Sequence, residues 1–383
     1  MRIAIDARPG VSAGMTGIGH YTRELIARLP LVDPETTYVA WYLQVAAILK
    51  PWKRQRFFAA RPNLVERWTP FPATWFERLS QRWSVPRVEW FARSDVLFAP
   101  NFVPPPTATR RLVVTVHDLA FRLFPETAPH STREWLGRLD RALEQAAEII
   151  AVSEATKRDL VRLYPVAEER VTVIPHGVDR ARHRPAAGAE VAEVRARYRL
   201  DEPYLLFVGG IEPRKNLPGL VRAFAMLEEA PSLVIAGSSV SWNPEGRGEL
   251  RAALATIPGD ARDRIRFTGY VGDREKVALL TGAAALVFPS RYEGFGMPVL
   301  EAMACGTPVV TSKVSALPEV AGDAALYVDP DDPGDVARGM REVLEDEGLR
   351  AHLRREGLAR VGAFDWDETA RRTAKVLHRA ALA

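Results

Sequence analysis

Cysteine and long apolar runs are almost missing from this sequence. Cys305 is the only cysteine among 383 residues, so the chain can form neither an internal disulfide nor a cysteine-based zinc site. No stretch approaches the roughly 18 apolar residues that a bilayer-spanning helix needs. The opening residues RIAID (2–6) are typical of a buried strand and not of a signal peptide. These absences predict a protein that is made and kept in the cytoplasm.

A strong excess of charge of either sign is missing too. The chain has 52 Lys and Arg against 48 Asp and Glu, a net charge of +4, and 47% hydrophobic residues, which is ordinary for a globular protein. Because 383 residues exceed what one hydrophobic core usually holds, two domains are expected.

Short apolar runs alternate with helical patterns, which predicts parallel α/β units. We expect two Rossmann-like domains that face each other across a cleft, spanning residues 1–182 and 200–364, with a polar linker between them. A final helix at 365–383 is expected to pack back on the first domain. In open α/β sheets ligands bind at the carboxyl ends of the strands, so the site is predicted there. The predicted strands are 2–6, 37–43, 96–100, 111–118 and 148–153 in the first domain, and 203–210, 232–237, 264–269, 284–290, 307–312 and 325–329 in the second.

The stretch RYEGFGMPVLEAMACGTPVV (291–310) places two glutamates around a glycine-rich corner between a strand and a helix. Pro298 suits the start of a helix, whose free amides and dipole favour an anion such as a diphosphate. Glu301, early in that helix, can accept hydrogen bonds from a vicinal diol such as a ribose. Glu293, one loop earlier, would lie where a sugar ring sits. An isolated pair of glutamates is more often simply solvated, so this alternative stays open.

The same stretch resembles the E-x7-E motif of family 4 glycosyltransferases, retaining enzymes of the GT-B fold. The resemblance extends over nearly the whole chain through DARPG, GIGHYTREL, TVHDLAF, IIAVSEATKRDL, VIPHGVD, FVGGIEPRKN and FTGYV, in that order. It implies transfer of a hexose from a nucleoside diphosphate sugar to a hydroxyl of a glycan or lipid-linked acceptor. GDP-mannose is the favoured donor, with UDP-glucose close behind, and neither a cofactor nor a metal is expected.

The resemblance also implies roles for individual residues. Arg214 and Lys215 resemble the clamp on the donor diphosphate, where two fixed cations can take the place of a metal. Glu301 would hold the ribose, and Glu293 the hydroxyls of the donor sugar. His117 would support positive charge on the reacting carbon. The implied catalytic residues are Glu293, His117, Arg214 and Lys215, and the implied donor-binding residues are Gly17, Gly19, Arg214, Lys215, Tyr270, Val271, Glu293, Gly294, Phe295, Gly296 and Glu301.

Two motifs that suggest other cofactors are better explained differently. Gly17 and Gly19 begin a dinucleotide fingerprint, but Thr22 stands where its third glycine would be, so we expect a glycine loop near donor or acceptor and no NAD site. The acidic run DPDDPGD (329–335) resembles a metal-binding D-x-D motif. It precedes a helical pattern, and we interpret it as a helix cap far from the cleft.

Residues 50–93 hold ten Lys and Arg against three Glu, and five of the nine tryptophans. No recognised nucleic-acid-binding module is present, so no nucleic-acid partner is expected. Two interpretations stay open. In the first, the aromatic side chains pack helices onto the sheet and the arginines are solvated. In the second, this surface contacts the acceptor, either by stacking on its sugars or at the inner face of a membrane. The excess of positive charge favours the second.

Two rival functions stay open, and the first of them has the same architecture. A non-hydrolysing sugar-nucleotide epimerase would need carboxylates placed for proton abstraction, and it gives no reason for two glutamates beside an Arg-Lys pair. A sugar-nucleotide-binding protein without activity would not need the motif residues intact.

Overall fold

The computed structural model describes residues 1–383 except 13–16, 45–55, 126–131, 201–202, 229–230 and 238–243, and the side chains of 132–136 and 244–245 are also outside the description. The chain forms two compact α/β units. The first comprises Met1–Leu119, Arg133–Gly177 and Asp365–Ala383, and the second comprises Ala120–Thr132 and Val178–Phe364.

The first unit is built on a seven-stranded parallel sheet with the order β3-β2-β1-β4-β5-β6-β7. Its central strands are rich in Val, Ile and Leu and almost fully buried, as expected of a parallel sheet covered on both faces. The chain runs outward from β1 to β3, then returns to β4 and runs the other way, so the order reverses between β1 and β4. The strands are β1 Arg2–Asp6, β2 Thr37–Leu43, β3 Leu64–Thr69, β4 Val96–Ala99, β5 Leu112–Val116, β6 Ala146–Ala151 and β7 Val171–Val173. The edge strands β3 and β7 were not predicted. β3 is half-exposed and mixes polar with apolar residues, and β7 has only three residues.

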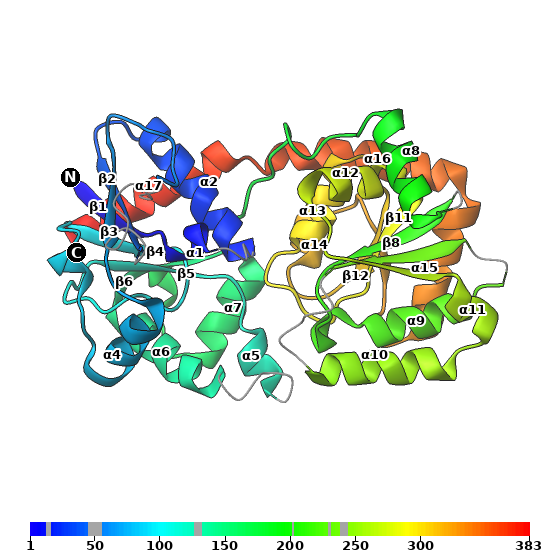
Figure 1. The fold of residues 1–383 in the computed structure, drawn as a ribbon, viewed down its shortest axis with the longest axis horizontal. Helices are drawn as coiled ribbons and strands as arrows, with labels where there is room; N and C mark the ends of the chain where they lie inside the picture. Colours follow the sequence, from blue (N-terminus) through cyan, green and yellow to red (C-terminus); the bar gives the residue numbers. More distant parts are fainter. Residues whose placement is uncertain (13–16, 45–55, 126–131, 201–202, 229–230, 238–243) are drawn as a thin grey trace. The chain divides into compact units, whose positions relative to one another are not determined.

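Helices cover both faces of this sheet, with α2 and α17 on one side and α6 and α7 on the other (Figure 1). α17 packs along α2, and Thr369 Oγ1 donates a hydrogen bond to the Pro175 carbonyl at 2.9 Å. The chain passes so closely here that a Cβ on Gly177 would lie 2.3 Å from the backbone nitrogen of Trp366. The last helix is therefore part of the first unit's core. The helices are α1 Arg8–Val11, α2 Gly17–Val32, α4 Ala73–Trp83, α6 Thr132–Gln145, α7 Glu154–Leu163 and α17 Trp366–Leu382.

The second unit has a six-stranded parallel sheet with the order β10-β9-β8-β11-β12-β13, which reverses between β8 and β11. In Figure 1, α12 and α13 lie on one side of it and α9 and α10 on the other. The strands are β8 Tyr204–Val208, β9 Ser232–Ala236, β10 Ile265–Gly269, β11 Ala285–Phe288, β12 Val309–Ser312 and β13 Leu326–Val328. The helices are α5 Ala120–Leu123, α8 Gly188–Tyr198, α9 Leu217–Ala225, α10 Pro244–Thr256, α11 Gly259–Asp263, α12 Asp273–Gly282, α13 Met297–Ala304, α14 Leu317–Ala321, α15 Pro333–Glu345 and α16 Glu347–Arg360.

The division between the units differs from the predicted boundaries. The segment expected to be a linker belongs to the second unit, because α8 packs on α12 and Tyr198 donates a 2.7 Å hydrogen bond to Glu275. Residues 178–182 and Ala120–Thr132, which were predicted in the first domain, also belong to the second unit. The predicted cleft between the domains stays a prediction.

Candidate active site

Two basic residues and one acidic residue meet where the second sheet reverses its strand order. Arg214 and Lys215 lie in a short 3-10 helix, Pro213–Lys215, after β8, and Glu293 lies in the loop after the adjacent strand β11. Arg214 Nη1 is 2.8 Å from Glu293 Oε2, and Lys215 Nζ is 3.1 Å from Glu293 Oε1. The reversal point of an open α/β sheet is where ligands bind. These three predicted residues are therefore brought together at the position where a ligand is expected.

The charged cluster is buried and held by further hydrogen bonds. Lys215 and Glu293 are each 7% exposed. Ser290 Oγ donates to Glu293 Oε1 at 3.1 Å, and the Glu293 backbone nitrogen donates to Ser315 Oγ at 2.9 Å. Burial by itself would raise the pKa of Glu293, but the charges of Arg214 and Lys215 outweigh it and lower this pKa to about 2. Glu293 is thus ionised at neutral pH and cannot donate a proton there.

Glu301 has a separate set of partners. It lies in the second turn of α13, where Lys276 Nζ from α12 is 2.8 Å from its Oε1 and His183 Nε2 is 3.4 Å from the same oxygen. Burial lowers the pKa of His183, with Glu301 opposing the shift, so this ring is neutral at neutral pH. Sequence reasoning missed His183 and Lys276, because a single basic residue inside an ordinary helical or loop pattern gives no signal of its partner.

The glycine corner between β11 and α13 has the backbone that only glycine adopts readily. Gly296 caps α13 with φ +106°, and a Cβ there would lie 2.8 Å from Leu317 Cδ2. Gly294 is buried beside it. The Phe295 side chain is buried against Phe364, with ring centroids 5.9 Å apart, which leaves its backbone for any contact with a ligand.

Tyr270 and Val271, predicted at the nucleotide base, follow the edge strand β10. The Tyr270 side chain is 79% exposed, whereas Val271 is buried. An exposed ring beside the sheet edge can stack on a planar group, and a buried valine offers only its backbone.

The remaining predicted residues lie in the first unit. His117 follows β5, and its Nε2 donates a 2.9 Å hydrogen bond to the Pro100 carbonyl, which leaves Nδ1 as the acceptor of a neutral ring. Burial lowers the pKa of His117, although this bond and the charge of Asp118 oppose the shift. His117 also stacks on the ring of His176 at 5.4 Å and packs edge-on against Tyr21. The structure places a neutral, immobilised imidazole at the carboxyl end of the first sheet.

Gly17 and Gly19 do not form the predicted loop. Both lie in the first turn of α2, Gly17 exposed and Gly19 buried, and residues 13–16 before them lie outside the described residues. Neither glycine has a positive φ, and the helix begins at Gly17, earlier than expected.

The acidic run at 329–335 caps a helix, as interpreted, but it is not remote from the charged cluster. Asp332 Oδ1 accepts a 2.8 Å hydrogen bond from the Gly334 nitrogen at the start of α15. Arg291 pairs with Asp331 at 2.6 Å, and buried Asn216, next to Lys215, donates to the Pro330 carbonyl at 2.6 Å. The turn after β13 therefore contacts residues next to the charged cluster, whereas its predicted distance from the cleft between the domains stays a prediction. Among the residues that the structure describes, no group of three potential metal ligands is found.

The aromatic and basic segment at 50–93 divides into buried and exposed parts. Trp75, Trp83 and Trp90 are 59%, 61% and 62% exposed, whereas Trp68 packs against the core; Trp52 lies outside the described residues. Within the described chain, no helix is both long and apolar enough to cross a membrane.

Comparison with known proteins identifies the family of this chain. Residues 16–182 match the family model Glycosyltransferase Family 4, and residues 192–360 match Glycosyl transferases group 1. The chain is 29% identical over 395 residues to the O-antigen chain mannosyltransferase B of Escherichia coli, covering 97% of this chain and 98% of the relative. It is 35% identical over 243 residues to a D-inositol 3-phosphate glycosyltransferase of Streptomyces avermitilis, covering 60% and 51%. The structure of Anabaena Alr3699/HepE in complex with UDP-glucose has the same fold, with a TM-score of 0.72 at 17% identity over 99% of this chain and 100% of that one.

The two parallel-sheet units, their likeness to solved structures and both family models define a glycosyltransferase of the GT-B fold. The chain belongs to the family 4 glycosyltransferases and is a hexosyltransferase.

Proposed function

We propose that this enzyme transfers mannose from a nucleoside diphosphate mannose to a hydroxyl of a glycan or lipid-linked acceptor, with retention of configuration and without a metal. The observation that carries the proposal is the buried cluster of Arg214, Lys215 and Glu293 at the reversal point of the second sheet. The similarity to a mannosyltransferase along the full length of both chains supports mannose.

The proposed chemistry follows from the charges in the cluster. The bond between the sugar carbon and the diphosphate oxygen breaks, a bond from that carbon to the acceptor oxygen forms, and the acceptor proton passes to the departing diphosphate. Arg214 and Lys215 would stabilise the negative charge that builds up on the diphosphate. Glu293, ionised and paired, would align these cations and accept hydrogen bonds from the donor sugar. Neutral His117 would favour the positive charge that develops on the sugar, because a neutral ring does not repel it.

The nucleotide is proposed to bind along α13. Glu301, with Lys276 holding its Oε1, would accept hydrogen bonds from the ribose at its other oxygen. The diphosphate would lie near the first turn of the helix, where free amides favour an anion. The proposed contacts to the base come from the backbone of residues 268–271. Backbone contacts of this kind do not distinguish guanine from uracil, so an experiment has to decide between GDP-mannose and UDP-glucose.

A membrane contact on the first unit is part of the proposal. Trp75 and Trp83 are exposed on α4 together with Arg78 and Arg82, and Trp90 is exposed just beyond the helix. Tryptophan favours the interface of a bilayer, and each basic residue near an anionic leaflet contributes about 1 kcal/mol. This combination suits a protein that binds reversibly to the cytoplasmic face of a membrane.

The test is incubation of the full chain with labelled GDP-mannose and UDP-glucose, with and without acceptor. Release of GDP with mannose attached to the acceptor at unchanged anomeric configuration supports the proposal. Transfer from UDP-glucose only would overturn mannose as the sugar. An epimerised sugar nucleotide would instead indicate the isomerase alternative.

A further inference from the structure

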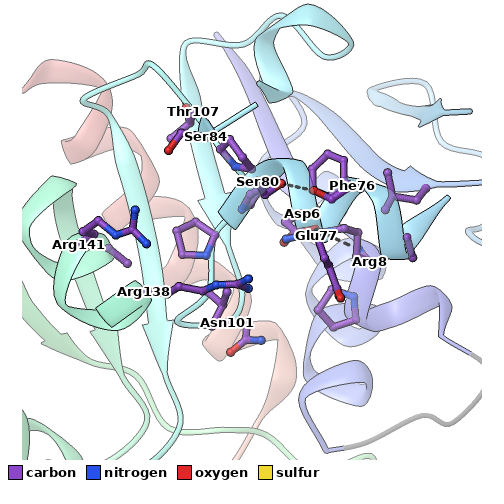
Figure 2. A pocket seen from close by; sticks show the side chains of 18 of the residues that line it. Asp6, Arg8, Phe76, Glu77, Ser80, Ser84, Asn101, Thr107, Arg138 and Arg141 are labelled. Carbon is purple, nitrogen blue, oxygen red and sulfur yellow. Dashed lines mark hydrogen bonds and ion pairs between the residues drawn. The ribbon is translucent and has the colours of Figure 1, made fainter. Parts of the chain in front are cut away.

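The Glu301 carboxylate has all of its described contacts on one oxygen. Lys276 Nζ lies 2.8 Å from Oε1 and His183 Nε2 lies 3.4 Å from the same atom, whereas Oε2 has no partner among the residues that the structure describes. These three residues all belong to the second unit. Asp6, beside a cavity of about 530 Å³ in the first unit, shows the opposite arrangement, because Arg8 donates to both of its oxygens at 2.8 and 2.7 Å (Figure 2). The protein thus holds one oxygen of Glu301 and leaves the other to a ligand.

His183 is buried although its ring makes no hydrogen bond. The residue is 7% exposed, and neither ring nitrogen has a hydrogen-bond partner within the described part of the chain. The 3.4 Å from its Nε2 to Glu301 Oε1 exceeds the length of an N–H···O hydrogen bond, which is about 2.7–3.2 Å. A buried polar atom without a partner costs free energy, so an unpaired imidazole beside this carboxylate indicates a role that offsets the cost.

The turn that carries His183 is fastened to α12, the helix that also carries the lysine bound to Glu301. Arg182, the preceding residue, pairs with Asp273 at the start of α12, with Nη1 and Oδ2 3.3 Å apart. The Ala186 nitrogen donates a 3.0 Å hydrogen bond to Thr281 Oγ1 near the end of the same helix. The imidazole and the ammonium group are therefore supported by one helix, and both approach the same carboxylate oxygen.

We propose that His183 is a positioning residue for the donor nucleotide: in the nucleotide-bound enzyme its Nε2–H donates to Glu301 Oε1, and this bond holds Oε2 toward the ribose. The inference rests on the proposed function, in which Glu301 binds the ribose. The last torsion of a glutamate side chain is broad, and a lysine ammonium is a point charge on a flexible stem. Lys276 alone consequently leaves the carboxylate free to turn. A second donor, on a ring that packing holds in place, fixes its plane.

Nucleotide binding supplies the small movement that this bond requires. A shift of about 0.5 Å brings Glu301 Oε1 to hydrogen-bond length from His183 Nε2. Two ribose hydroxyls that order the carboxylate from its other side can cause such a shift. Burial lowers the pKa of His183, so the ring is neutral at neutral pH and has one N–H to donate.

The experiment measures binding of GDP, UDP and their 2′,3′-dideoxy forms to the full chain by calorimetry. The dideoxy forms keep the base and the diphosphate and lack only the diol. His183→Phe keeps a flat ring without an N–H, and His183→Gln keeps an N–H close to the position of Nε2. We expect His183→Phe to bind the ribonucleotide about tenfold more weakly than the wild type and to bind the dideoxy form equally well. His183→Gln should recover most of the lost affinity.

A second measurement separates this role from simple packing. Without nucleotide, His183→Phe should be at least as stable to urea as the wild type, because the substitution removes two buried nitrogens that have no partner. A residue that only packed the site would lose stability and affinity together. The matched control is His352→Phe on the exposed face of α16, which should change neither quantity.

Each outcome either supports or overturns the inference. Unchanged ribonucleotide affinity in His183→Phe overturns it, and so does an equal loss of affinity for the dideoxy form. If His183→Phe does not fold, His183→Leu, which also lacks an N–H, replaces it in the same comparison. Failure of the proposed function has a different signature, since the wild type would then bind neither GDP nor UDP, or would bind the dideoxy form as tightly as the ribonucleotide. Either result removes the ribose assignment and the inference with it.

Discussion

Arg214 and Glu293 lie 79 residues apart in sequence (214 to 293), and their side chains form a 2.8 Å ion pair at the carboxyl ends of two adjacent strands. Glu293 is buried, the Arg214 side chain is partly buried, and Lys215 binds the other carboxylate oxygen. Breaking a buried pair by removing one partner is costly because it leaves a charge without compensation. The cluster therefore contributes to stability as well as to the proposed chemistry.

Glu293→Gln should lower the stability of the second unit in a pH-dependent way. The pKa of Glu293 is lowered in the folded protein to about 2, so its stabilising contribution is present above about pH 4.5 and is lost as the pH falls toward 2. The shift corresponds to about 3 kcal/mol. In urea titrations the difference in unfolding free energy between wild type and Glu293→Gln should be largest at pH 7 and should decrease below pH 4.5. The control Glu345→Gln, at an exposed helix end, should show no such gap; a gap for Glu293→Gln that is constant down to pH 3 would contradict the assignment.

The two glutamates should separate functionally. Glu301→Ala should mainly weaken nucleoside diphosphate binding, because the ribose contact exists before and during the reaction, whereas Glu293→Ala should mainly lower kcat. Calorimetry with GDP and initial rates with GDP-mannose measure the two effects. The control is Glu345→Ala, which should change neither quantity. Unchanged GDP affinity in Glu301→Ala would contradict the assignment of Glu301 to the ribose.

Transfer should not need a divalent metal. Arg214 and Lys215 would supply the positive charge that a metal otherwise provides to the departing diphosphate. Loss of one such group typically lowers the rate by about 10²–10³-fold. Rates should be unaffected by EDTA and should fall at least 10²-fold in an Arg214→Ala, Lys215→Ala variant. Loss of transfer in EDTA that Mg²⁺ or Mn²⁺ restores argues against this prediction, and so does near-normal activity of the double variant.

Binding to anionic vesicles should depend on α4. Trp75→Ala with Trp83→Ala should reduce co-sedimentation with anionic vesicles at low salt by at least fivefold, because two exposed rings are removed from the proposed interface. Phe267→Ala, at a half-exposed aromatic position in the second unit, is the control and should have no effect. The membrane contact is refuted if the wild type binds neither anionic nor neutral vesicles at low or physiological salt.

Gly177→Ala should destabilise the attachment of the last helix. The new Cβ would lie 2.3 Å from the Trp366 nitrogen, so the backbone must shift, at a cost of about 1–3 kcal/mol. Thermal unfolding should show a lower Tm than the wild type. Gly137→Ala in α6, where the new Cβ has open space, should leave the Tm unchanged or raise it; equal Tm values for both variants would falsify the close approach.

Most of the architecture follows from local patterns in the sequence. Runs such as those of β1, β5 and β8 are apolar and rich in branched residues, and each is followed by a helical pattern, so a parallel α/β fold is the consequence. The E-x7-E stretch identified Glu293, the glycine corner and the helix that holds Glu301. Those features are local, because a corner of glycines and a helix start need only neighbouring residues to form.

Only the tertiary structure decided which charges meet. The sequence alone did not indicate that Lys276 binds Glu301 or that Asn216 donates a hydrogen bond to the turn at Pro330. It also did not indicate that Arg138 and Arg141 line a cavity with Asp6. In each case the residues belong to separate elements of the chain. It also misplaced Gly17 and Gly19, whose φ angles depend on how α2 packs. Partners distant in sequence are fixed by strand order and helix packing, and these depend on the whole core rather than on any one segment.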